Sequence, residues 1–295
     1  MEPSSDDGDL TTAAFTKTSF ILLLCLFVCF KSYQFVRPQK KAVAQTVAST
    51  VSHKAIVQRK SEKKKSKKKK LYLTFDDGPN RGTKNVLHIV EDEQAPVTFF
   101  IVGEHVFASN TQHQLWDSLK MAQHIVLCSH SYSHAHNHYE RYYSQPDSVV
   151  HDFERTQDSL DLDNNIVRTP GRNIWRIDSL HFTDLKKSAA AADSLQKAGF
   201  VLMGWDLEWE FDHKTMHVTT DASVIVRQID SIFKWGKTIY PDHLVLLAHD
   251  QVYDKSDDSL QLRLLLQQLK QKEDIELSLV TTYPGTNKRD TVVIK

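Results

Sequence analysis

Two adjacent carboxylates, Asp76 and Asp77, follow residues 71–75, which alternate between faces in the manner of a β-strand. Gly78 and Pro79 come directly afterwards and predict a turn. Because side chains on neighbouring residues at a strand end point in different directions, the two carboxylates can lie in one cleft and do two different jobs. The alternative interpretation is a polar turn without chemistry, since Asp-Asp-Gly-Pro is good turn sequence in any protein.

A pair of histidines, His130 and His134, forms the second candidate group. Their spacing predicts that both imidazoles lie on one side of a helical turn. With a carboxylate from another strand end they would make a metal site of two histidines and one carboxylate, with open coordination positions. Zinc is the default ion, and cobalt, iron or another divalent ion remains open. The nearby His136 and His138 leave the alternative of a histidine-rich polar surface loop.

Three more polar residues follow predicted strands: His249, Arg168 and Asp206. A histidine placed directly after a buried apolar strand suits a general acid, because an imidazole gains and loses a proton near neutral pH. Alternatively, His249 only caps its strand. Arg168 and Asp206 could hold catalytic groups in place through charged hydrogen bonds, or they could form a structural ion pair.

Two tryptophans, Trp205 and Trp209, flank Asp206 at short distance in the sequence. They could form the wall of a substrate pocket or pack in the core. Cys128 is interpreted as a small buried strand residue, because a lone cysteine in the body of the chain has no partner there for a disulfide.

Strand-like and helix-like segments that could position these residues alternate from residue 71 onward. Strands are predicted at 71–75, 97–102, 125–128, 166–168, 200–205, 244–248 and 275–280. Helices are predicted at 83–93, 112–123, 146–160, 188–198, 223–235 and 259–272. About seven β/α units of this kind favour an α/β barrel over an α+β arrangement. The carboxyl ends of parallel barrel strands meet on one face, where active sites are built, and the candidate residues follow strands.

The charge of the chain is divided unevenly, although the formal net charge is +0. Residues 1–70 hold 15 Lys and Arg against 5 Asp and Glu, whereas the remaining residues hold 22 against 32. A basic leader is therefore joined to an acidic body, and the body lacks the basic surplus that nucleic-acid binding requires. The lysines at Lys63–Lys70 are expected to form a solvated, disordered tether that could contact a polyanion such as anionic lipid or a wall polymer.

The leader also contains a hydrophobic segment, residues 19–36, around the unbroken apolar run Phe20–Phe30. This run is shorter than the about 20 residues of a membrane span and has the length of a signal-peptide core. We interpret the segment as an uncleaved membrane anchor. More Lys and Arg follow the run than precede it, and this charge pattern argues for a cytoplasmic body.

Four motifs occur in order along the body: Asp76-Asp77-Gly-Pro after Thr-Phe, His130-x-x-x-His134, Arg168-x-Pro170 and Leu247-x-His249. Together they resemble the metal-dependent polysaccharide deacetylases, the NodB-homology esterases of carbohydrate esterase family 4. The resemblance covers about residues 71–283. It implies a distorted (β/α) barrel that removes acetyl groups from N-acetylated or O-acetylated sugars, such as those of peptidoglycan or a chitin-like polymer.

The resemblance also implies a role for each matching residue. Three of them would be the metal ligands: Asp77, His130 and His134. Four would be catalytic. Asp76 would be the general base and His249 the general acid. Arg168 would orient Asp76, and Asp206 would support His249. Apart from these roles, four residues are predicted to contact substrate, with core packing as the alternative for the two tryptophans: Trp205, Trp209, Gly171 and Leu247. Gly171 stands where the family usually has an aromatic residue, in a loop that normally supplies a backbone N–H to the oxyanion.

The domain organisation expected from these observations has five parts. They are a polar tail at 1–18, the hydrophobic segment at 19–36, the Lys-rich linker at 37–70, the NodB-like catalytic domain at 71–285 and a C-terminal tail at 286–295. The catalytic domain is expected to be membrane-anchored and extracytoplasmic, in the periplasm or at the cell surface, against the charge pattern. Three alternatives remain: a catalytically silent carbohydrate-binding protein, an amidohydrolase of a small non-sugar amide, and a tethered wall-binding factor.

Overall fold

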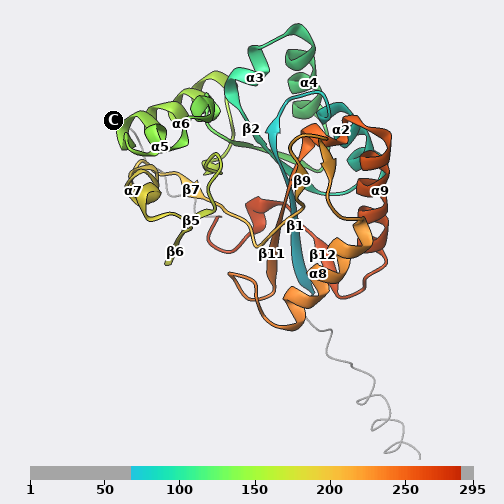
Figure 1. Ribbon diagram of the computed structural model, residues 1–295. Coiled ribbons are helices and arrows are strands. Elements are labelled where there is room, and N and C mark those ends of the chain that lie inside the picture. The colour runs from blue at the N-terminus through green and yellow to red at the C-terminus, as the bar shows by residue number, and fades with distance from the viewer. Residues whose placement is uncertain (1–67, 287–295) are drawn as a thin grey trace, which may run out of the picture. The chain divides into compact units, whose positions relative to one another are not determined.

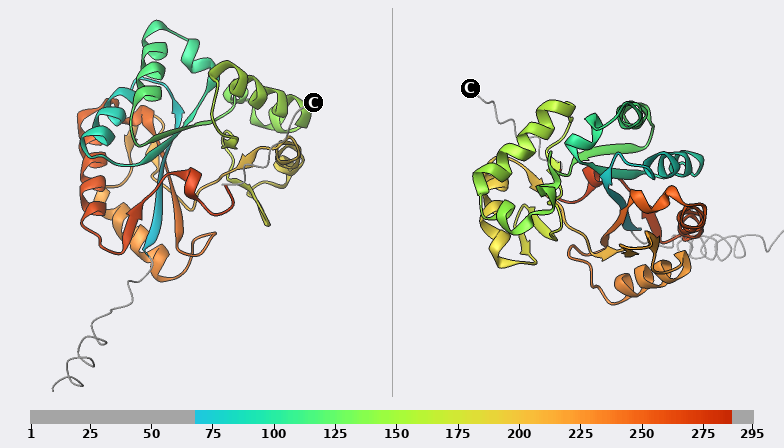
Figure 2. Two further views of the ribbon diagram at one scale, coloured as in Figure 1. Left: turned by 180° about the vertical axis from the view of Figure 1, so that it is seen from behind. Right: turned by 45° about the horizontal axis from the view of Figure 1, so that its top comes forward.

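The structure is a computed structural model that describes residues 68–286. These residues form a mixed α/β fold in which one curled, half-barrel sheet is covered by helices, as Figures 1 and 2 show. The strand order across the sheet is β6-β5-β7-β4-β3-β2-β1-β11-β8, and β12 pairs with the start of β1. Within residues 68–286, β6 and β8 remain the two edges, so the sheet does not close. The predicted distorted (β/α) barrel is confirmed.

The elements alternate along the chain. The strands are β1 (Lys69–Gly78), β2 (Val97–Ile101), β3 (Ile125–Ser129), β4 (Ile166–Val167), β5 (Ile174–Ile177), β6 (Leu180–Thr183), β7 (Val201–Leu202), β8 (Leu207–Glu208), β9 (Phe211–Asp212), β10 (His217–Val218), β11 (His243–His249) and β12 (Ile275–Leu277). The α-helices are α2 (Thr83–Asp92), α3 (Gly103–Phe107), α4 (Asn110–Met121), α5 (Tyr139–Tyr143), α6 (Pro146–Leu160), α7 (Ala189–Lys197), α8 (Ala222–Lys234) and α9 (Ser256–Lys270). Short 3-10 helices are η1 (His134–Asn137), η2 (Lys186–Ser188), η3 (Asp250–Asp254) and η4 (Val280–Thr282).

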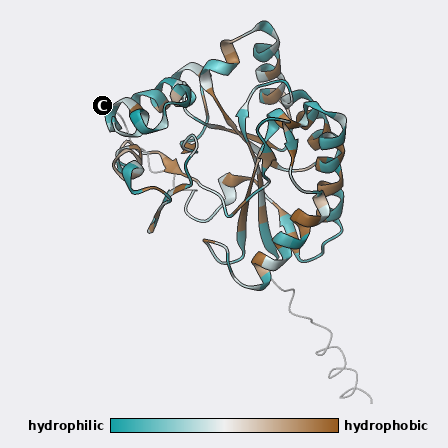
Figure 3. Cartoon of the chain, viewed as in Figure 1, coloured by the Kyte–Doolittle hydropathy of each residue, from teal (hydrophilic) through white to brown (hydrophobic). Residues whose placement is uncertain are grey.

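Alternation along β1 separates two cores, because successive side chains of a strand point to opposite faces. Leu71, Leu73 and Phe75 face outward and pack with apolar residues of α2, α4, α8 and α9. Tyr72 faces the inside of the curled sheet, in a separate core with Val245 of β11 and residues of β2, β3 and β5. Figure 3 shows the apolar colouring concentrated on the strands and on the helix faces turned toward them. Thr74 and Asp76 continue the inward row, so the inner face of β1 leads directly to a carboxylate.

Most of the predicted elements are confirmed, with shifted ends. Helix α6 has the predicted bounds, whereas β1 begins two residues before the predicted strand and continues past it. The β5–β6 hairpin was not predicted, and β5 pairs antiparallel with both β6 and β7. The predicted strand at 200–205 is shorter, since only Val201 and Leu202 pair with β4. Cys128 is fully buried in β3, as expected.

The predicted polar tail, hydrophobic segment and most of the Lys-rich linker lie outside the described residues, as does nearly all of the C-terminal tail. Among residues 68–286, no helix has both the length and the apolar character that crossing a membrane requires.

Replacing Leu265 by alanine should lower the free energy of unfolding by about 2–5 kcal/mol, because its fully buried side chain fills the core between α9 and the sheet. Leu260 on the same helix is 54% exposed, so Leu260→Ala should change stability by only about 0.5 kcal/mol. Urea titrations of both variants measure this difference. Equal losses would mean that α9 does not pack through the Leu265 face.

Candidate active site

A β-bulge at the end of β1 places both carboxylates at one rim of the sheet. The pairing with β2 passes from Phe75 opposite Phe99 to Gly78 opposite Ile101, so β1 carries one extra residue in this interval. Asp77 has φ 75°, in the left-handed region, whereas a regular strand would point its side chain away from that of Asp76. The nitrogen Nε2 of His130 is 3.6 Å from Asp76 Oδ2 and 3.5 Å from Asp77 Oδ1. The two carboxylates thus lie close to the same imidazole at one rim of the sheet.

Asp77, His130 and His134 form a compact group of three metal-ligating side chains. One ligand atom from each lies within 4.8 Å of the others, and His134 Nε2 is 3.1 Å from Asp77 Oδ1. Asp77 Oδ1 is buried and forms no hydrogen bond of good geometry. His130 Nδ1 is 2.9 Å from the backbone carbonyl of Arg168; donating its proton there leaves Nε2 free as a ligand atom. The donor set therefore fits a divalent ion such as zinc, although the ligands alone do not select the metal.

The carboxylates and imidazoles of this cluster stabilise one another's charged forms. Burial would raise the pKa of Asp77, but the His130 and His134 imidazoles outweigh this effect and hold the pKa well below its usual range. Burial would lower the pKa of His130, and the Asp76 and Asp77 carboxylates reverse that effect and raise the pKa. The site therefore keeps Asp77 as an anion, the form in which a carboxylate binds a cation.

The predicted helical turn between His130 and His134 is wrong. Residues after β3 adopt left-handed backbone conformations, with φ 67° at Ser131 and φ 47° at His134. The side chain of Ser131 accepts a hydrogen bond from the His134 N–H, and Ser133 Oγ donates to Asp152 of α6. A tight loop, held by these bonds, brings the two imidazole rings to a centroid distance of 5.1 Å.

Arg168 directly follows β4 and reaches across the inside of the sheet to Asp76. Its fully buried guanidinium donates to Asp76 Oδ1 at 2.8 Å and to Thr74 Oγ1 at 2.8 Å. Its remaining donors bond the backbone carbonyls of Met203 and Gly204. Oδ1 of Asp76 is thereby occupied, while its Oδ2 lies 3.6 Å from His130 Nε2; the orienting function of Arg168 stays a prediction.

His249 ends β11 directly opposite Asp76, in the register of the parallel pair. Its Nδ1 is 4.0 Å from Glu208 Oε1, and its ring packs on Phe211 at a centroid distance of 5.1 Å. Burial raises the pKa of Glu208, while His249 opposes this shift. Glu208 is therefore the carboxylate beside His249. It was not among the predicted site residues, although it lies between Asp206 and Trp209 in the sequence.

The predicted support of His249 by Asp206 is wrong. Asp206 lies at the amino end of β8, opposite Val245, four residues before His249 in β11. Its carboxylate accepts hydrogen bonds from the backbone N–H groups of Ile239 and Val245, at 2.6 and 2.8 Å. Burial raises the pKa of Asp206 to about 6, against the effect of these two bonds. Asp206 therefore secures the connection into β11.

The four residues predicted to contact substrate differ in their burial in the structure. Trp209 is 1% exposed, packs on Tyr253 and donates through its indole to a backbone carbonyl, so its predicted contact with substrate is wrong. Leu247 is 2% exposed and lies one layer below His249, which removes it from the substrate surface as well. Trp205 is half-buried with its ring 5.9 Å from the Arg168 guanidinium, and Gly171 is exposed with φ 63°.

Two further residues near the cleft were not singled out in the sequence. Asp250 is fully buried and accepts hydrogen bonds from Asn80 and Thr83, so the residue after His249 ties down the turn after Asp77. Burial raises the pKa of Asp250 to about 7. Tyr139, at the start of α5, lies edge-on to the His134 ring. Neither had a sequence signal, because both depend on contacts between distant segments.

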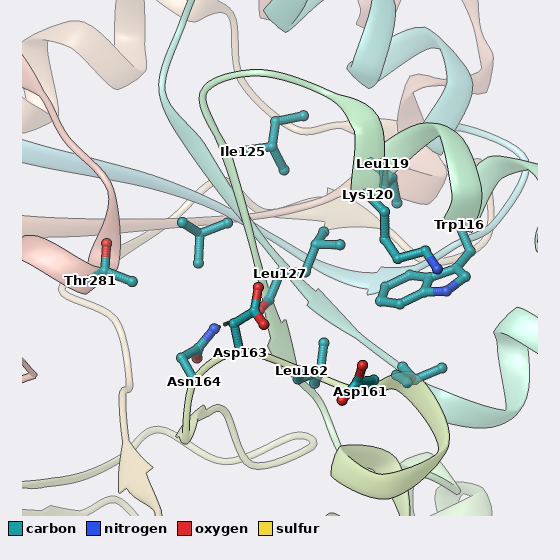
Figure 4. Close-up of a pocket in the computed structure, with 12 residues that line it drawn as sticks. Trp116, Leu119, Lys120, Ile125, Leu127, Asp161, Leu162, Asp163, Asn164 and Thr281 are labelled. Carbon is teal, nitrogen blue, oxygen red and sulfur yellow. Dashed lines mark hydrogen bonds between the residues drawn. The ribbon is translucent and has the colours of Figure 1, made fainter. Parts of the chain in front are cut away.

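A pocket of about 330 Å³ lies elsewhere, beside the start of β3, and Figure 4 shows its lining. Its walls include Trp116 and Lys120 of α4, Leu127 of β3 and Asn164 before β4. None of the predicted site residues lines it. The rim formed by Asp76, Asp77 and the histidines is therefore distinct from this pocket.

Comparison with known proteins points to one family. Residues 63–174 match the family model described as polysaccharide deacetylase. A chitin disaccharide deacetylase of Vibrio alginolyticus is 23% identical over 301 residues, which cover 73% of this chain and 68% of that protein.

Two solved structures share the fold. The family 4 carbohydrate esterase from Streptomyces lividans, in complex with acetate, has a TM-score of 0.52 at 18% identity, covering 74% of this chain and 95% of that one. The catalytic domain of a peptidoglycan N-acetylglucosamine deacetylase from Eubacterium rectale has a TM-score of 0.51 at 20% identity, covering 73% and 90%.

Asp206→Asn should weaken the pH dependence of stability between about pH 4 and 6. The folded protein holds the Asp206 proton up to about pH 6, whereas an aspartate in the unfolded chain has an ordinary pKa of about 3.9, so this group's contribution to the free energy of unfolding falls as pH rises through that window. The fall should be on the order of 2 kcal/mol in the wild type and absent for this site in the variant. Urea titrations at pH 4, 5 and 6 compare the slopes, and identical slopes would contradict the burial of this carboxylate.

Proposed function

Because the chain belongs to the polysaccharide deacetylases of carbohydrate esterase family 4, we propose that it hydrolyses acetyl groups from an acetylated polysaccharide with the help of a divalent metal ion. The observation that carries this proposal is the arrangement at the end of β1. Asp77 joins two histidines in a metal-ligating group, while Asp76 lies beside that group with one oxygen held by Arg168. Two adjacent carboxylates thereby acquire different surroundings and different functions.

Asp77 Oδ1, His130 Nε2 and His134 Nε2 would hold the ion. When bound, the ion supplies Lewis-acid chemistry: it polarises the acetyl carbonyl and brings the pKa of water from about 16 toward 7. The fit rests on the buried, unbonded oxygen of Asp77 and on the Nδ1–H donation of His130. Zinc is the ion we propose, since two imidazoles and one carboxylate are a familiar zinc donor set.

The remaining residues of the chain move protons. Asp76 accepts the proton of the attacking water on Oδ2, because Arg168 occupies Oδ1. A C–O bond forms at the acetyl carbon and the bond from that carbon to the sugar nitrogen or oxygen breaks. His249, opposite Asp76 at the end of β11, donates the proton that the leaving atom takes up. Glu208 Oε1 lies 4.0 Å from His249 Nδ1, on the side of the ring away from Nε2, and would orient the imidazole. Acetate and a free amine or hydroxyl are the products.

The substrate proposed here is an N-acetylated glycan, as in chitin oligosaccharides or peptidoglycan. The support is chemical and comparative: the site serves acyl transfer, and the relatives compared above are named for chitin disaccharide and peptidoglycan N-acetylglucosamine. Such polymers lie outside the cytoplasm, so we place the catalytic domain there, held at the membrane by residues 19–36 through the basic linker. Lys63–Lys70 would contact anionic lipid or wall polymer.

The first test is acetate release from a panel of substrates: N-acetylglucosamine oligomers, peptidoglycan, acetylated xylan and a small non-sugar amide. We expect release from an N-acetylated glycan, loss of activity after chelation and recovery with zinc or cobalt, because the acyl carbonyl must be polarised. His134→Ala should lose zinc affinity and turnover together. The outcome against the proposal is glycan binding without acetate release in the zinc-loaded wild type, which would indicate a carbohydrate-binding protein.

Asp76→Asn should bind zinc within about threefold of the wild-type affinity and lose about 10²–10⁴-fold in kcat, because the amide keeps the shape of the side chain but cannot take a proton. Zinc competition with a chromophoric chelator and acetate release measure the two properties separately. A variant that loses zinc binding would make Asp76 a ligand, and a variant with near-normal kcat would exclude it as the base.

A further inference from the structure

Tyr139 lies beside the metal-ligating group although it is not one of the predicted site residues. Its ring meets the His134 ring edge-on, at a centroid distance of 5.9 Å and an interplanar angle of 83°. The side chain is half-buried. Its hydroxyl donates to Asn137 Oδ1 at 3.2 Å, a bond to an exposed neighbour in the same loop. The partly exposed ring and its hydroxyl therefore lie beside a proposed metal ligand.

Gly171 has no side chain, and the Tyr139 ring packs where a side chain at position 171 would begin. A Cβ atom added at Gly171 would lie 3.1–3.4 Å from three carbons of the Tyr139 ring. Gly171 also has φ 63°, a conformation that glycine adopts without the steric cost of a side chain. The ring of Tyr139 thus rests against bare backbone in the loop after Arg168. A side chain at position 171 would push the ring from its present position by a few tenths of an ångström.

A second contact fixes the same two segments to each other. Tyr143, one turn after Tyr139 in α5, is buried and donates its hydroxyl to the carbonyl of Pro170 at 2.6 Å. Helix α5 and the loop after β4 are therefore joined at both ends of the helix. Helix α5 is only five residues long, so its position depends on contacts with its neighbours. These contacts therefore set where Tyr139 lies relative to Arg168 and His134.

We propose that Tyr139 is a substrate-binding residue, whose ring and hydroxyl hold the acetylated sugar unit over the metal-ligating group, and that Gly171 is required to admit it. This inference rests on the deacetylase function proposed above. A tyrosine suits such a ligand because its flat apolar face covers the C–H surface of a pyranose while its hydroxyl bonds a sugar oxygen. The bond to Asn137 is exposed, so the hydroxyl can exchange this partner for the sugar.

The test compares Tyr139→Phe and Tyr139→Ala with the wild type on the N-acetylglucosamine oligomer that the substrate panel identifies. Tyr139→Ala should raise KM about tenfold, and Tyr139→Phe about threefold, with kcat within about threefold of the wild type. Oligomer affinity measured in an Asp76→Asn background should weaken by the same factors, which removes turnover from the measurement. Phe182→Ala, which truncates a 41% exposed aromatic residue on β6, is the matched control and should change neither constant.

A double-mutant cycle with Gly171→Ala tests the link between the two residues. Gly171→Ala should raise KM in the presence of Tyr139 and have little further effect when position 139 is already alanine, because the backbone strain at φ 63° is common to both backgrounds. Zinc affinity and thermal stability separate the roles. A structural role would lower zinc affinity or the melting temperature in Tyr139→Ala without a selective change in KM.

The outcomes distinguish this inference from the proposed function. An active wild type whose KM and oligomer affinity are unchanged in Tyr139→Ala overturns the inference alone. Additive effects in the double-mutant cycle overturn the part assigned to Gly171. A zinc-loaded wild type that releases acetate from no member of the panel overturns the proposed function, and the role of Tyr139 in it falls as well.

Discussion

The buried pairing of Arg168 with Asp76 is the constraint around which the inside of the sheet is arranged. A fully buried guanidinium carries a large desolvation cost unless its donors are satisfied. Here they bond Asp76, Thr74 and two backbone carbonyls, and the ring of Phe100 lies 4.1 Å from its centre. These bonds tie β4 and the segment after β7 to β1 across the interior. One side chain therefore joins three segments inside the half-barrel and holds one oxygen of the Asp76 carboxylate.

Asp76 points into the interior of the sheet, whereas the β-bulge at Asp77 turns the neighbouring carboxylate away from it. It turns the second carboxylate out of the inward row and toward two imidazoles, which hold it as an anion. Asp76 lies against a guanidinium and Asp77 against histidines, so two residues of the same type obtain different chemistry from their partners alone. Asp250 secures the arrangement from the other side, because it bonds the turn that follows the bulge while occupying the position after His249.

Loops and one short helix surround the metal-ligating group. The left-handed loop after β3 carries His134, the loop after β4 carries Gly171, and helix α5 packs between them. Positions of this kind are tolerated only where surrounding contacts hold them, and the bonds of Ser131, Ser133 and Tyr143 supply those contacts. The strand ends thus place Asp76, His130 and Arg168, and the loops place His134 and Gly171.

The sequence by itself determined the α/β architecture, the carboxylate pair, the two histidines and the arginine, because alternation and motif spacing are local properties. It misplaced Asp206, Trp209 and Leu247, since strand register decides whether a side chain reaches the rim or remains one layer below it. The register of these residues arises from the pairing of β8 with β11 and of β11 with β1. Because β8 and β11 are far from β1 in the chain, no local sequence pattern reveals this register. Glu208 beside His249 and Tyr139 against Gly171 were decided by the tertiary structure alone, because each contact joins segments whose proximity no local pattern records.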